Sequence, residues 1–320
     1  MKLVVQIPAF NEEKNISRVI KEIPKKIDGI DKIEILVIDD GSSDNTSLEA
    51  KKAGAHYVVR NKENIGLAQT FQRGINKSLS LGAGIIVNTD ADFQYNQNEI
   101  SKLIQPIIQG KADIVSGNRQ VETLSHMVSS KKYGNIIGSK VVELSAGYKI
   151  ADASSGFRAY SRDAALRLFV ISKHTYTHET LIQAKRKNLK VVEVPVEFRK
   201  REQSNSKLIS SVGSHIKKSM STIMRSTLMY NSMKTLGYLG VLMMALGAIP
   251  MIRWAWLTYI EHSAGNHIQS LLLGLLLIML GFLTVMLGFI SDLIATNRRH
   301  LEEILYRIRR AELKISENGK

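Results

Sequence analysis

The sequence of 320 residues contains no cysteine, only five prolines and few aromatic residues (6%). Without cysteine, the chain forms no disulfide, uses no thiolate nucleophile and holds no cysteine-ligated zinc or iron–sulfur centre. The low proline count and a hydrophobic fraction of 44% argue against a disordered or collagen-like chain. Acidic residues are also scarce, because 29 Asp and Glu stand against 44 Lys and Arg, which gives a formal net charge of +15. This excess indicates phosphate groups or an anionic membrane surface as partners.

Charge is missing altogether from two long segments near the C-terminus. Residues 235–252 contain no charged side chain, and after Arg253 the run 254–260 is again uncharged. Residues 268–291 form another uncharged run, dominated by Leu, Ile, Met, Phe and Gly. About 20 apolar residues cross a bilayer as a helix, whereas core helices of soluble proteins rarely reach this length without a polar face. We therefore predict transmembrane helices over residues 235–260 and 268–291.

Basic residues flank these two segments on one side only. Eight of them lie from Arg199 to Lys234 and five from Arg298 to Arg310, whereas the connecting loop 261–267 contains no Lys or Arg. Positively charged flanks stay in the cytoplasm. The sequence therefore predicts an integral membrane protein with its first domain and both termini in the cytoplasm and a short loop outside.

Two further segments border the predicted spans. Residues 209–233 combine Ser, Lys, His and Met with apolar residues at helical spacing, which favours amphipathic helices on the inner leaflet over a plain linker helix. Residues 292–320 predict a charged cytoplasmic helix with one apolar face. That face pairs with the tail of a partner or lies on the membrane, and the sequence leaves both open. Its apolar residues are Leu301, Ile304, Leu305 and Ile308.

Residues 1–208 alternate between short runs rich in Val and Ile and amphipathic segments. Strands are predicted at residues 2–7, 33–38, 56–59, 85–89 and 114–116. Helices are predicted between them, at residues 12–26, 44–53, 65–80 and 97–109. This alternation is typical of βαβ units and predicts a Rossmann-like, mostly parallel α/β sheet. Ligands bind such sheets at the carboxyl ends of the strands, so the residues that follow each strand are the candidates for chemistry.

Acidic residues follow two of the predicted strands. Asp39 and Asp40 form a tight turn after the second strand, where turn formation is the alternative to a functional role. Asp90, Asp92 and Gln94 follow the fourth strand, and alternate residues of an extended segment project to the same side. Carboxylate and amide oxygens suit Mg²⁺ or Mn²⁺, with the diphosphate of a substrate completing the coordination.

Several of these motifs together resemble the inverting family-two glycosyltransferases of GT-A fold. They are residues 8–13 (Pro-Ala-Phe-Asn-Glu-Glu), 39–42 (Asp-Asp-Gly-Ser), 64–66 (Asn-Ile-Gly) and 90–94 (Asp-Ala-Asp-Phe-Gln). Further motifs narrow the resemblance to dolichol-phosphate mannose synthases and to the polyprenyl-phosphate glycosyltransferases of bacteria and archaea that have a two-span membrane anchor. They are residues 117–119 (Gly-Asn-Arg), 152–158 (ending Ser-Gly-Phe-Arg), Arg201 and 206–208 (Ser-Lys-Leu).

The resemblance implies inverting transfer of one sugar from a UDP- or GDP-sugar to a polyprenyl phosphate, undecaprenyl or dolichyl phosphate, at the cytoplasmic membrane face. It also implies that Asp92 and Gln94 bind Mg²⁺ or Mn²⁺. The donor-binding residues that it implies are Pro8, Phe10, Glu12, Val37, Asp39, Asp90, Ala91, Asp92, Arg119, Arg201 and Lys207. The implied catalytic residues are Asp92, Arg119 and Arg201, and the candidates for holding the acceptor phosphate are Arg119, Lys132 and Arg201.

Two positions depart from the family pattern. Phe10 stands where many relatives have Tyr, so a hydroxyl contact is lost while the ring remains. The family often has an arginine before the helix that follows Arg119, and here His126, Lys131 and Lys132 are the alternatives.

Three residues have open roles. Asp152 and Arg158 either form a salt bridge with each other or lie near the sugar, and Glu179 is a further candidate for a sugar contact.

Three other functions compete with this prediction. A processive polysaccharide synthase of the same family carries a Gln-x-x-Arg-Trp motif, but here Pro250 occupies the Gln position before Arg253 and Trp254. A non-catalytic membrane scaffold would not need the intact set of Asp90, Asp92 and Gln94. Nucleic-acid binding is disfavoured because the positive charge gathers beside the membrane segments. A homo-oligomer remains open.

Overall fold

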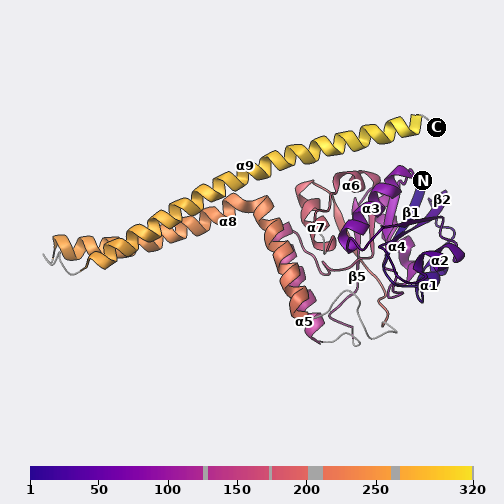
Figure 1. Cartoon of the computed structure of the whole chain (residues 1–320), viewed down its shortest axis with the longest axis horizontal. Helices are drawn as coiled ribbons and strands as arrows, with labels where there is room; N and C mark the ends of the chain where they lie inside the picture. The colour runs from indigo at the N-terminus through magenta and orange to yellow at the C-terminus, as the bar shows by residue number, and fades with distance from the viewer. Residues whose placement is uncertain (125–128, 173–174, 201–211, 261–266, 319–320) are drawn as a thin grey trace. The chain divides into compact units, whose positions relative to one another are not determined.

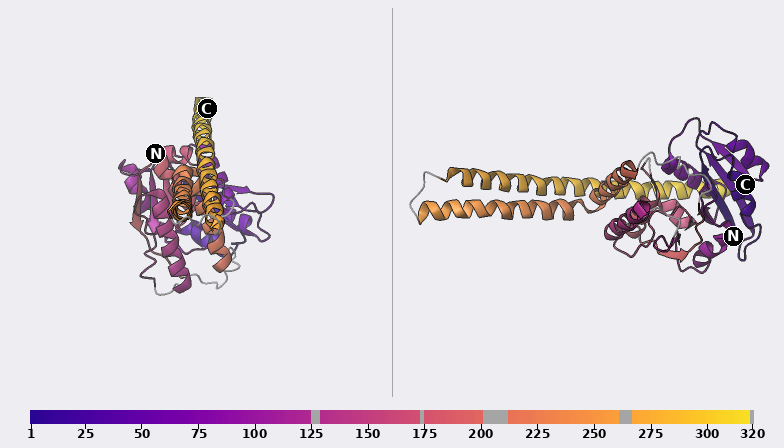
Figure 2. Two further views of the ribbon diagram at one scale, coloured as in Figure 1. Left: turned by 90° about the vertical axis from the view of Figure 1, so that its left-hand side faces the viewer. Right: turned by 90° about the horizontal axis from the view of Figure 1, so that it is seen from below.

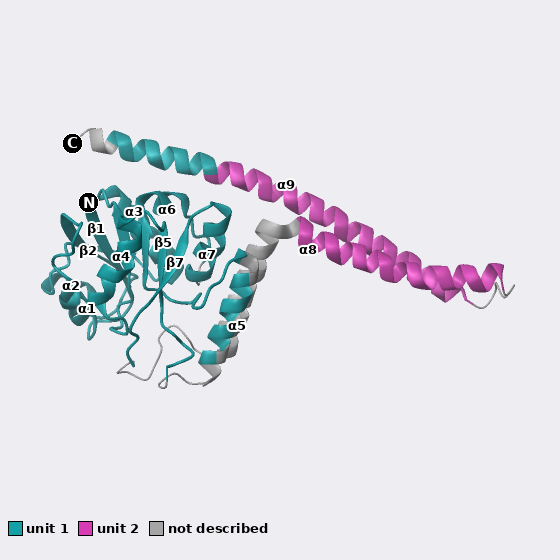
Figure 3. Cartoon of the chain, turned by 180° about the vertical axis from the view of Figure 1, so that it is seen from behind, with its two compact units in different colours: residues 1–223, 303–320 teal, residues 224–302 magenta. Residues whose placement is uncertain are grey.

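The computed structural model describes residues 1–124, 129–172, 175–200, 212–260 and 267–318 (Figure 1). These residues form two compact units (Figure 3). The first joins Met1–Ile223 to Glu303–Lys320 from the other end of the chain, and the second consists of Met224–Glu302. The α/β domain and the end of the C-terminal helix therefore belong to one unit, and the two apolar segments form the other.

A seven-stranded sheet forms the centre of the first unit, in the order β3-β2-β1-β4-β6-β5-β7. Its strands are β1 (Lys2–Ala9), β2 (Lys32–Asp39), β3 (Tyr57–Arg60), β4 (Ile85–Asn88), β5 (Ile114–Asn118), β6 (Arg158–Ser161) and β7 (Val191–Pro195). Only β6 runs antiparallel to its neighbours, β4 and β5. The predicted mostly parallel α/β sheet is confirmed.

Helices cover both faces of the sheet. One layer consists of α1 (Ile16–Glu22), α2 (Thr46–Lys52) and α4 (Ile100–Ile108). The other consists of α3 (Leu67–Ser80), α6 (Arg162–Arg167) and α7 (Thr177–Arg186). Along β1, Leu3, Val5 and Ile7 face the first layer and Val4 faces the second, and all four are fully buried. A strand covered on both faces has to be apolar at successive positions, which explains the short Val- and Ile-rich runs.

The sequence predicted the elements of the first 120 residues and missed most of those that follow. The predicted helix 12–26 shortens to α1, because Glu12 accepts backbone hydrogen bonds from Asn15 and Ile16 in a turn before the helix. The fourth predicted helix begins as a 3₁₀ turn, η1 (Gln97–Glu99), and continues as α4. The missed elements are α5 (Ser129–Ala146), α6, α7, β6 and β7. β6 begins with a buried arginine and contains no Val or Ile, which explains why it was missed. β7 contains three valines and has the composition of the predicted strands, so its composition does not explain why it was missed.

The register of the sheet brings distant loops to one edge. Ala9 at the end of β1 pairs with Asp39 at the end of β2, and Gln6 pairs with Asn88 at the end of β4. Because β6 is antiparallel, its first residue, Arg158, pairs with Asn88. The segment before β6 therefore meets the segments that follow β1, β2 and β4 at the same edge.

The second unit consists of most of α8 (Val212–Tyr259) and the first part of α9 (Ile268–Asn318), which run side by side (Figures 1 and 2). Glycines line their contact. A Cβ atom added at Gly240 of α8 would lie 2.6 Å from the carbonyl oxygen of Gly281, and one added at Gly247 would lie 2.9 Å from that of Gly274. Small residues allow two helix backbones to approach closely, which is how helices associate where lipid removes the hydrophobic driving force between them.

Both helices are long and apolar enough to cross a membrane, at Met233–Tyr259 and within Ile268–Ile315. Only 11% and 17% of their most apolar stretches are buried, so among the described residues most of this apolar surface is uncovered. Each helix is continuous across two predicted segments. α8 begins within the predicted interfacial segment 209–233, and α9 continues through the predicted tail 292–320.

The end of α9 packs on the α/β domain. The Tyr306 hydroxyl donates a 2.9 Å hydrogen bond to Oδ1 of Asp163, at the start of α6. Arg309 donates from Nη1 to the carbonyl oxygen of Leu168 at 3.3 Å, and its guanidinium lies 5.2 Å from the centroid of the Phe169 ring. This contact explains why residues from 303 onward belong to the first unit.

Candidate active site

A pocket lies at the carboxyl edge of the sheet, beside the ends of β1, β2 and β4 and the start of α3. Its lining residues are Pro8, Ala9, Phe10, Glu12, Asp40, Asn64, Gly66, Leu67, Thr70, Asp90, Ala91 and Asp92. Six of the predicted donor-binding residues are among them: Pro8, Phe10, Glu12, Asp90, Ala91 and Asp92. The structure therefore brings together residues from the loops after β1, after β2, before α3 and after β4, and Pro8 and Asp92 are 84 positions apart in the sequence.

The loops after β1 and β2 hold each other in place. Asn11 has a left-handed backbone (φ 55°), donates its backbone N–H to Oγ of Ser42 at 2.9 Å, and accepts the backbone N–H of Ser43 at 2.8 Å. The backbone N–H of Glu12 donates to Oγ1 of Thr46 at 2.9 Å. These contacts fix the turn that presents Phe10 and Glu12 to the pocket.

Asp40 anchors the loop before α3, a role that the sequence analysis did not assign to it. Its Oδ1 accepts hydrogen bonds from the backbone N–H of Ile65 (2.9 Å) and from Nδ2 of Asn61 (2.7 Å), and its Oδ2 accepts from the backbone N–H of Gly66 (3.0 Å). The next residue, Gly41, has φ +73°, and a Cβ atom there would lie 2.7 Å from the carbonyl carbon of Glu63. The motifs at residues 39–42 and 64–66 contain the two sides of this contact, so they are the features of the sequence that indicate it.

Asp39 and Val37 do not line the pocket. The Asp39 side chain is fully buried, its Oδ1 accepts the backbone N–H of Ser42 at 2.8 Å, and its Oδ2 accepts the hydroxyl of Ser47. Val37 belongs to the core beneath α1 and α2. Asp39 thus shapes the turn after β2, and the predicted donor contacts of these two residues stay predictions.

Asp90 lies against the backbone of the segment that precedes β6. A Cβ atom at Gly156 would stand 2.8 Å and 3.0 Å from the two carboxylate oxygens of Asp90, and 3.0 Å from the hydroxyl of Tyr176. The buried Asn88 side chain donates to the carbonyl oxygen of Gly156 (2.9 Å) and to the Tyr176 hydroxyl (2.8 Å). Glycine at 156 is therefore what allows the Asp90 carboxylate to occupy this position.

Gln94 is oriented by the segment that follows β7. Its Nε2 donates to the carbonyl oxygen of Arg199 at 3.3 Å, and the backbone N–H of Arg199 donates to the carbonyl oxygen of Gln94 at 2.7 Å. Because the amide nitrogen is engaged, Oε1 is the atom of this side chain that suits a metal ion. Among the described residues, no three His, Cys, Asp or Glu side chains could hold a metal together. Asp92 and Gln94 fit an ion only if a substrate supplies further oxygen ligands.

Phe93, between these two predicted ligands, is held by two guanidinium groups. Arg18 lies 4.1 Å and Arg199 4.8 Å from the centroid of its ring. Arg199 also binds Glu22 at 2.8 Å, and this hydrogen bond raises the pKa of Arg199. Phe93 has a left-handed backbone (φ 64°), which is unfavourable for a bulky residue unless its surroundings impose it. No local pattern in the sequence indicates these contacts, because Arg18, Phe93 and Arg199 are distant in the chain.

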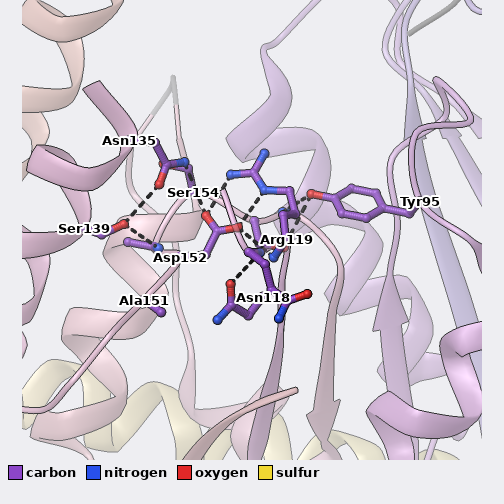
Figure 4. Close-up of polar contacts among 12 residues, drawn as sticks. Tyr95, Asn118, Arg119, Asn135, Ser139, Ala151, Asp152 and Ser154 are labelled. Atoms are coloured by element: carbon purple, nitrogen blue, oxygen red, sulfur yellow. Dashed lines mark hydrogen bonds and ion pairs between the residues drawn. The ribbon is translucent and has the colours of Figure 1, made fainter. Parts of the chain in front are cut away.

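Arg119 forms a two-point ion pair with Asp152 (Figure 4). Its Nε lies 2.6 Å from Oδ2 and its Nη2 lies 2.7 Å from Oδ1 of Asp152. Asn135 donates to the same Oδ1 at 3.3 Å, and Glu193 accepts the backbone N–H of Asp152 at 3.1 Å. The Tyr95 hydroxyl points toward Arg119 (Figure 4), and the Arg119 guanidinium lies 5.1 Å from the centroid of the Phe198 ring. Arg119 is not among the residues that line the pocket.

The ion pair decides the charge of both partners. Burial on its own would raise the pKa of Asp152, but Arg119 outweighs burial and holds that pKa below its ordinary value. Burial would lower the pKa of Arg119, but the neighbouring Tyr95 and Asp152 raise it. Burial raises the pKa of Tyr95 to about 12, so its phenol stays protonated at neutral pH. The pair is a fixed arginine cation and a fixed carboxylate.

Arg158 and Glu179 support loops. One of the two predicted alternatives was a salt bridge between Arg158 and Asp152. This alternative is wrong, because Arg158 does not pair with Asp152. Its guanidinium is fully buried and donates to the carbonyl oxygens of Thr177 (2.7 Å) and Ala153 (2.8 Å), which ties the segment before β6 to α7. Glu179 accepts the backbone N–H groups of residues 171 and 172.

The remaining predicted phosphate-binding residues are not placed at the pocket. The ammonium group of Lys132 donates to the carbonyl oxygen of Glu122. Arg201, Lys207 and the alternative His126 lie outside the described residues.

Comparisons with known proteins show the family to which the chain belongs. Residues 4–169, just over half of the chain, match the model of glycosyl transferase family 2. The UDP-N-acetylglucosamine–dolichyl-phosphate N-acetylglucosaminyltransferase of Methanococcus voltae is 32% identical over 214 residues, which are 59% of this chain and 82% of that protein. The polyprenol monophosphomannose synthase of Mycolicibacterium smegmatis is 27% identical over 239 residues, 68% of this chain and 84% of that protein.

A solved structure shares the fold. Glucosyl-3-phosphoglycerate synthase from Mycobacterium tuberculosis, in complex with Mn²⁺, uridine diphosphate and glucosyl-3-phosphoglycerate, superposes with a TM-score of 0.52. It is 21% identical and covers 71% of this chain and 78% of its own. The predicted GT-A fold is confirmed by this likeness. With the family model and the Methanococcus relative, it establishes that the chain is a glycosyltransferase and belongs to glycosyl transferase family 2.

Proposed function

We propose that the chain transfers one sugar, with inversion, from a UDP- or GDP-sugar to undecaprenyl or dolichyl phosphate at the cytoplasmic face of a membrane. The observation that carries the proposal is the pocket, because Asp90 and Asp92 meet the end of β1 and the loop before α3 there. Two relatives support it, since one is named for dolichyl phosphate as acceptor and the other as a polyprenol monophosphomannose synthase.

The donor is proposed to lie in this pocket, against Pro8, Phe10 and Glu12, with its diphosphate toward Asp90 and Ala91. Asp92 and Oε1 of Gln94 would hold Mg²⁺ or Mn²⁺, and the Mycobacterium structure with Mn²⁺ and uridine diphosphate supports a divalent ion. Such an ion, when bound, neutralises the charge that develops on the departing diphosphate. The contacts of Arg18 and Arg199 with the Phe93 ring keep the neighbouring Asp92 and Gln94 in their relative positions.

The acceptor is proposed to attack as an anion. A polyprenyl phosphate is ionised at neutral pH and needs no strong general base, but the approach of two anions needs fixed positive charge. Arg119 is one proposed cation, because its bonds to Asp152 use Nε and Nη2 and leave Nη1 without a hydrogen bond to any described residue. Arg201 is the second, since a guanidinium holds a phosphate by two parallel bonds. Lys132 and Lys207 are further candidates.

The membrane is where the two substrates meet in this proposal. α8 and α9 would anchor the chain by residues 235–260 and 268–291, with the basic flanks and both termini in the cytoplasm. Reporter fusions at Lys320 and in the loop 261–267 should locate these two points on opposite sides. A periplasmic or lumenal Lys320 would overturn this orientation.

The reaction is tested by incubating membranes that contain the protein with radiolabelled UDP- and GDP-sugars and with undecaprenyl or dolichyl phosphate. One donor should label the extracted lipid with a single sugar, and a chelator should abolish the labelling. The matched control is dolichol, which lacks the phosphate and should accept nothing. Labelled polymer, or no labelled lipid from any donor, would contradict the proposal.

A further inference from the structure

The tail of α9 carries a heptad repeat whose a and d positions are apolar except for Asn297. Leu305 at position e and Leu313 at position f are apolar residues outside this seam. Counting from Ile294 as position a, residues three or four apart fall on one stripe. The a positions are Ile294, Leu301, Ile308 and Ile315, and the d positions are Asn297, Ile304 and Ala311. The remaining tail positions are mostly charged or polar. This phase continues without interruption into the apolar span, where Leu280 and Leu287 occupy a and Leu283 and Ile290 occupy d.

The stripe is uncovered in a single copy of the chain. Leu301 is 66%, Ile308 49% and Ile315 73% exposed. Exposure of the apolar span needs no explanation, since lipid covers it. The tail follows Arg298 and Arg299 in a charged helix, and apolar side chains exposed there to water indicate a missing partner.

The other side of α9 is already occupied. α8 packs against Gly274, Gly281 and Gly288, which all stand at heptad position b. The α/β domain packs against Tyr306 and Leu313, both at position f. Positions b and f lie away from the a/d seam, so a partner at the seam and both of these contacts are compatible.

The length of α9 places its tail beyond the hydrocarbon core of a bilayer. α9 is one helix of 51 residues with no proline, and at 1.5 Å per residue it is about 77 Å long. The hydrocarbon core of a bilayer is only about 30 Å thick. A helix of this length that crosses the bilayer extends beyond its hydrocarbon core, and the cross-linking experiment below separates lipid from a second copy as the partner of its tail.

We propose that the tail of α9 pairs with the tail of a second copy as a parallel two-stranded coiled coil over residues 294–315. The orientation follows from the membrane, because two copies inserted in the same way have parallel α9 helices. In a parallel pair, position g of one helix faces position e of the next heptad of its partner. Arg307 stands at g and Glu312 at e, so the two copies present opposite charges to each other, and both side chains are exposed in one copy. Asn297 is the polar residue in the seam and would fix the register.

Cysteine cross-linking tests the pairing directly, because the full-length chain has no cysteine of its own. Ile304→Cys and Ile308→Cys place thiols in the seam, and Glu303→Cys and Arg310→Cys place them on the same exposed helix at position c. Under mild oxidation in membranes, the seam variants should form covalent dimers severalfold faster than the position-c variants. Their yield should persist when the protein is diluted with excess lipid, which removes random collisions.

Equal yields at all four positions, or yields that vanish on dilution, would overturn the proposal. So would thiols at 304 and 308 that are shielded from a water-soluble maleimide while no dimer forms, since another partner or lipid would then cover the stripe. The charge pair gives a second test in the Ile308→Cys background. Arg307→Glu should lower the dimer yield by about twofold, the scale of an exposed ion pair, and adding Glu312→Arg should restore it. A double variant no better than the single one would show that the two tails do not pair in this register.

Discussion

Apolar side chains face inward in the α/β domain and outward along α8 and α9. Leu3, Val5 and Ile7 of β1 are fully buried, whereas Leu272 and Met279 of α9 are 61% and 64% exposed. The residue types are alike, but strands of a sheet covered on both sides find their neighbours within the chain. α9 meets one neighbouring helix and, at its end, the α/β domain, and the rest of its apolar surface needs lipid or a second copy. The hydrophobicity of a segment thus indicates how much apolar surface needs to be buried. The fold determines whether that surface is buried by the chain itself, by lipid or by a second copy.

The Arg119–Asp152 pair should give the largest effect, because each of its two buried charges depends on the other for neutralisation. Asp152→Asn leaves a buried arginine without its counter-ion and should lower the free energy of unfolding by about 3–5 kcal/mol at pH 7. The measurement is thermal or denaturant unfolding of the α/β domain in the purified full-length protein. Unchanged unfolding would mean that the pair contributes nothing to the fold.

The same variant tests the pH dependence of stability. The pKa of Asp152 in the folded chain is held below its ordinary value of 3.8 by Arg119, although burial opposes this. A carboxyl whose pKa is lowered on folding stabilises the protein above its unfolded pKa, and this contribution is lost as the pH falls through the folded pKa. The difference in stability between wild type and Asp152→Asn should therefore be constant above about pH 5 and shrink below about pH 4.

A matched pair of leucines tests the comparison between the regions. Leu36 is fully buried in β2, and Leu36→Ala should lower the free energy of unfolding of the α/β domain by about 2–5 kcal/mol, since it opens a cavity. Leu272→Ala removes the same atoms from an exposed position on α9 and should leave that unfolding transition unchanged. Equal effects of the two substitutions would contradict the distinction between buried leucines of the α/β domain and exposed leucines of α9.

Asp92→Asn should affect activity and not folding. It removes one predicted metal ligand at the pocket and should lower the rate of sugar transfer by about 100-fold, or about 2.7 kcal/mol. Asp31→Asn is the control, because this exposed carboxylate pairs with the chain terminus at Met1. Full turnover by Asp92→Asn in excess chelator would exclude a metal-dependent reaction at this site.

Arg201→Lys should give the smallest loss. Lysine keeps the charge, and therefore the orientation in the membrane, but it does not hold a phosphate by two parallel bonds. Turnover should fall by about tenfold while insertion, followed with a reporter at Lys320, stays the same. Turnover at the wild-type level would mean that the basic residues around 199–207 serve only membrane orientation.

The sequence was a good guide where function depends on local order. Asp90, Ala91 and Asp92 follow a strand directly, so their place at the pocket follows from the strand itself. The sequence was a poor guide where the position of a side chain depends on contacts with a distant segment of the chain. Asp39 and Asp40 are adjacent and alike, yet Asp39 is buried in its own turn and Asp40 holds the loop before α3. Which carboxylate faces the pocket depends on the loop 61–66, which comes from another part of the chain.

The sequence by itself determined the α/β sheet, the two long apolar helices and the acidic strand ends, because apolar periodicity and strand-end position are properties of neighbouring residues. Only the tertiary structure decided that Arg119 pairs with Asp152, that Arg158 ties a loop to α7, and that two arginines hold Phe93. It also decided that the end of α9 packs on the α/β domain and leaves its a/d stripe exposed. These contacts join residues far apart in the chain. The sequence pattern shows that a charged or apolar group needs a partner when it is buried, but the fold determines which residue becomes that partner.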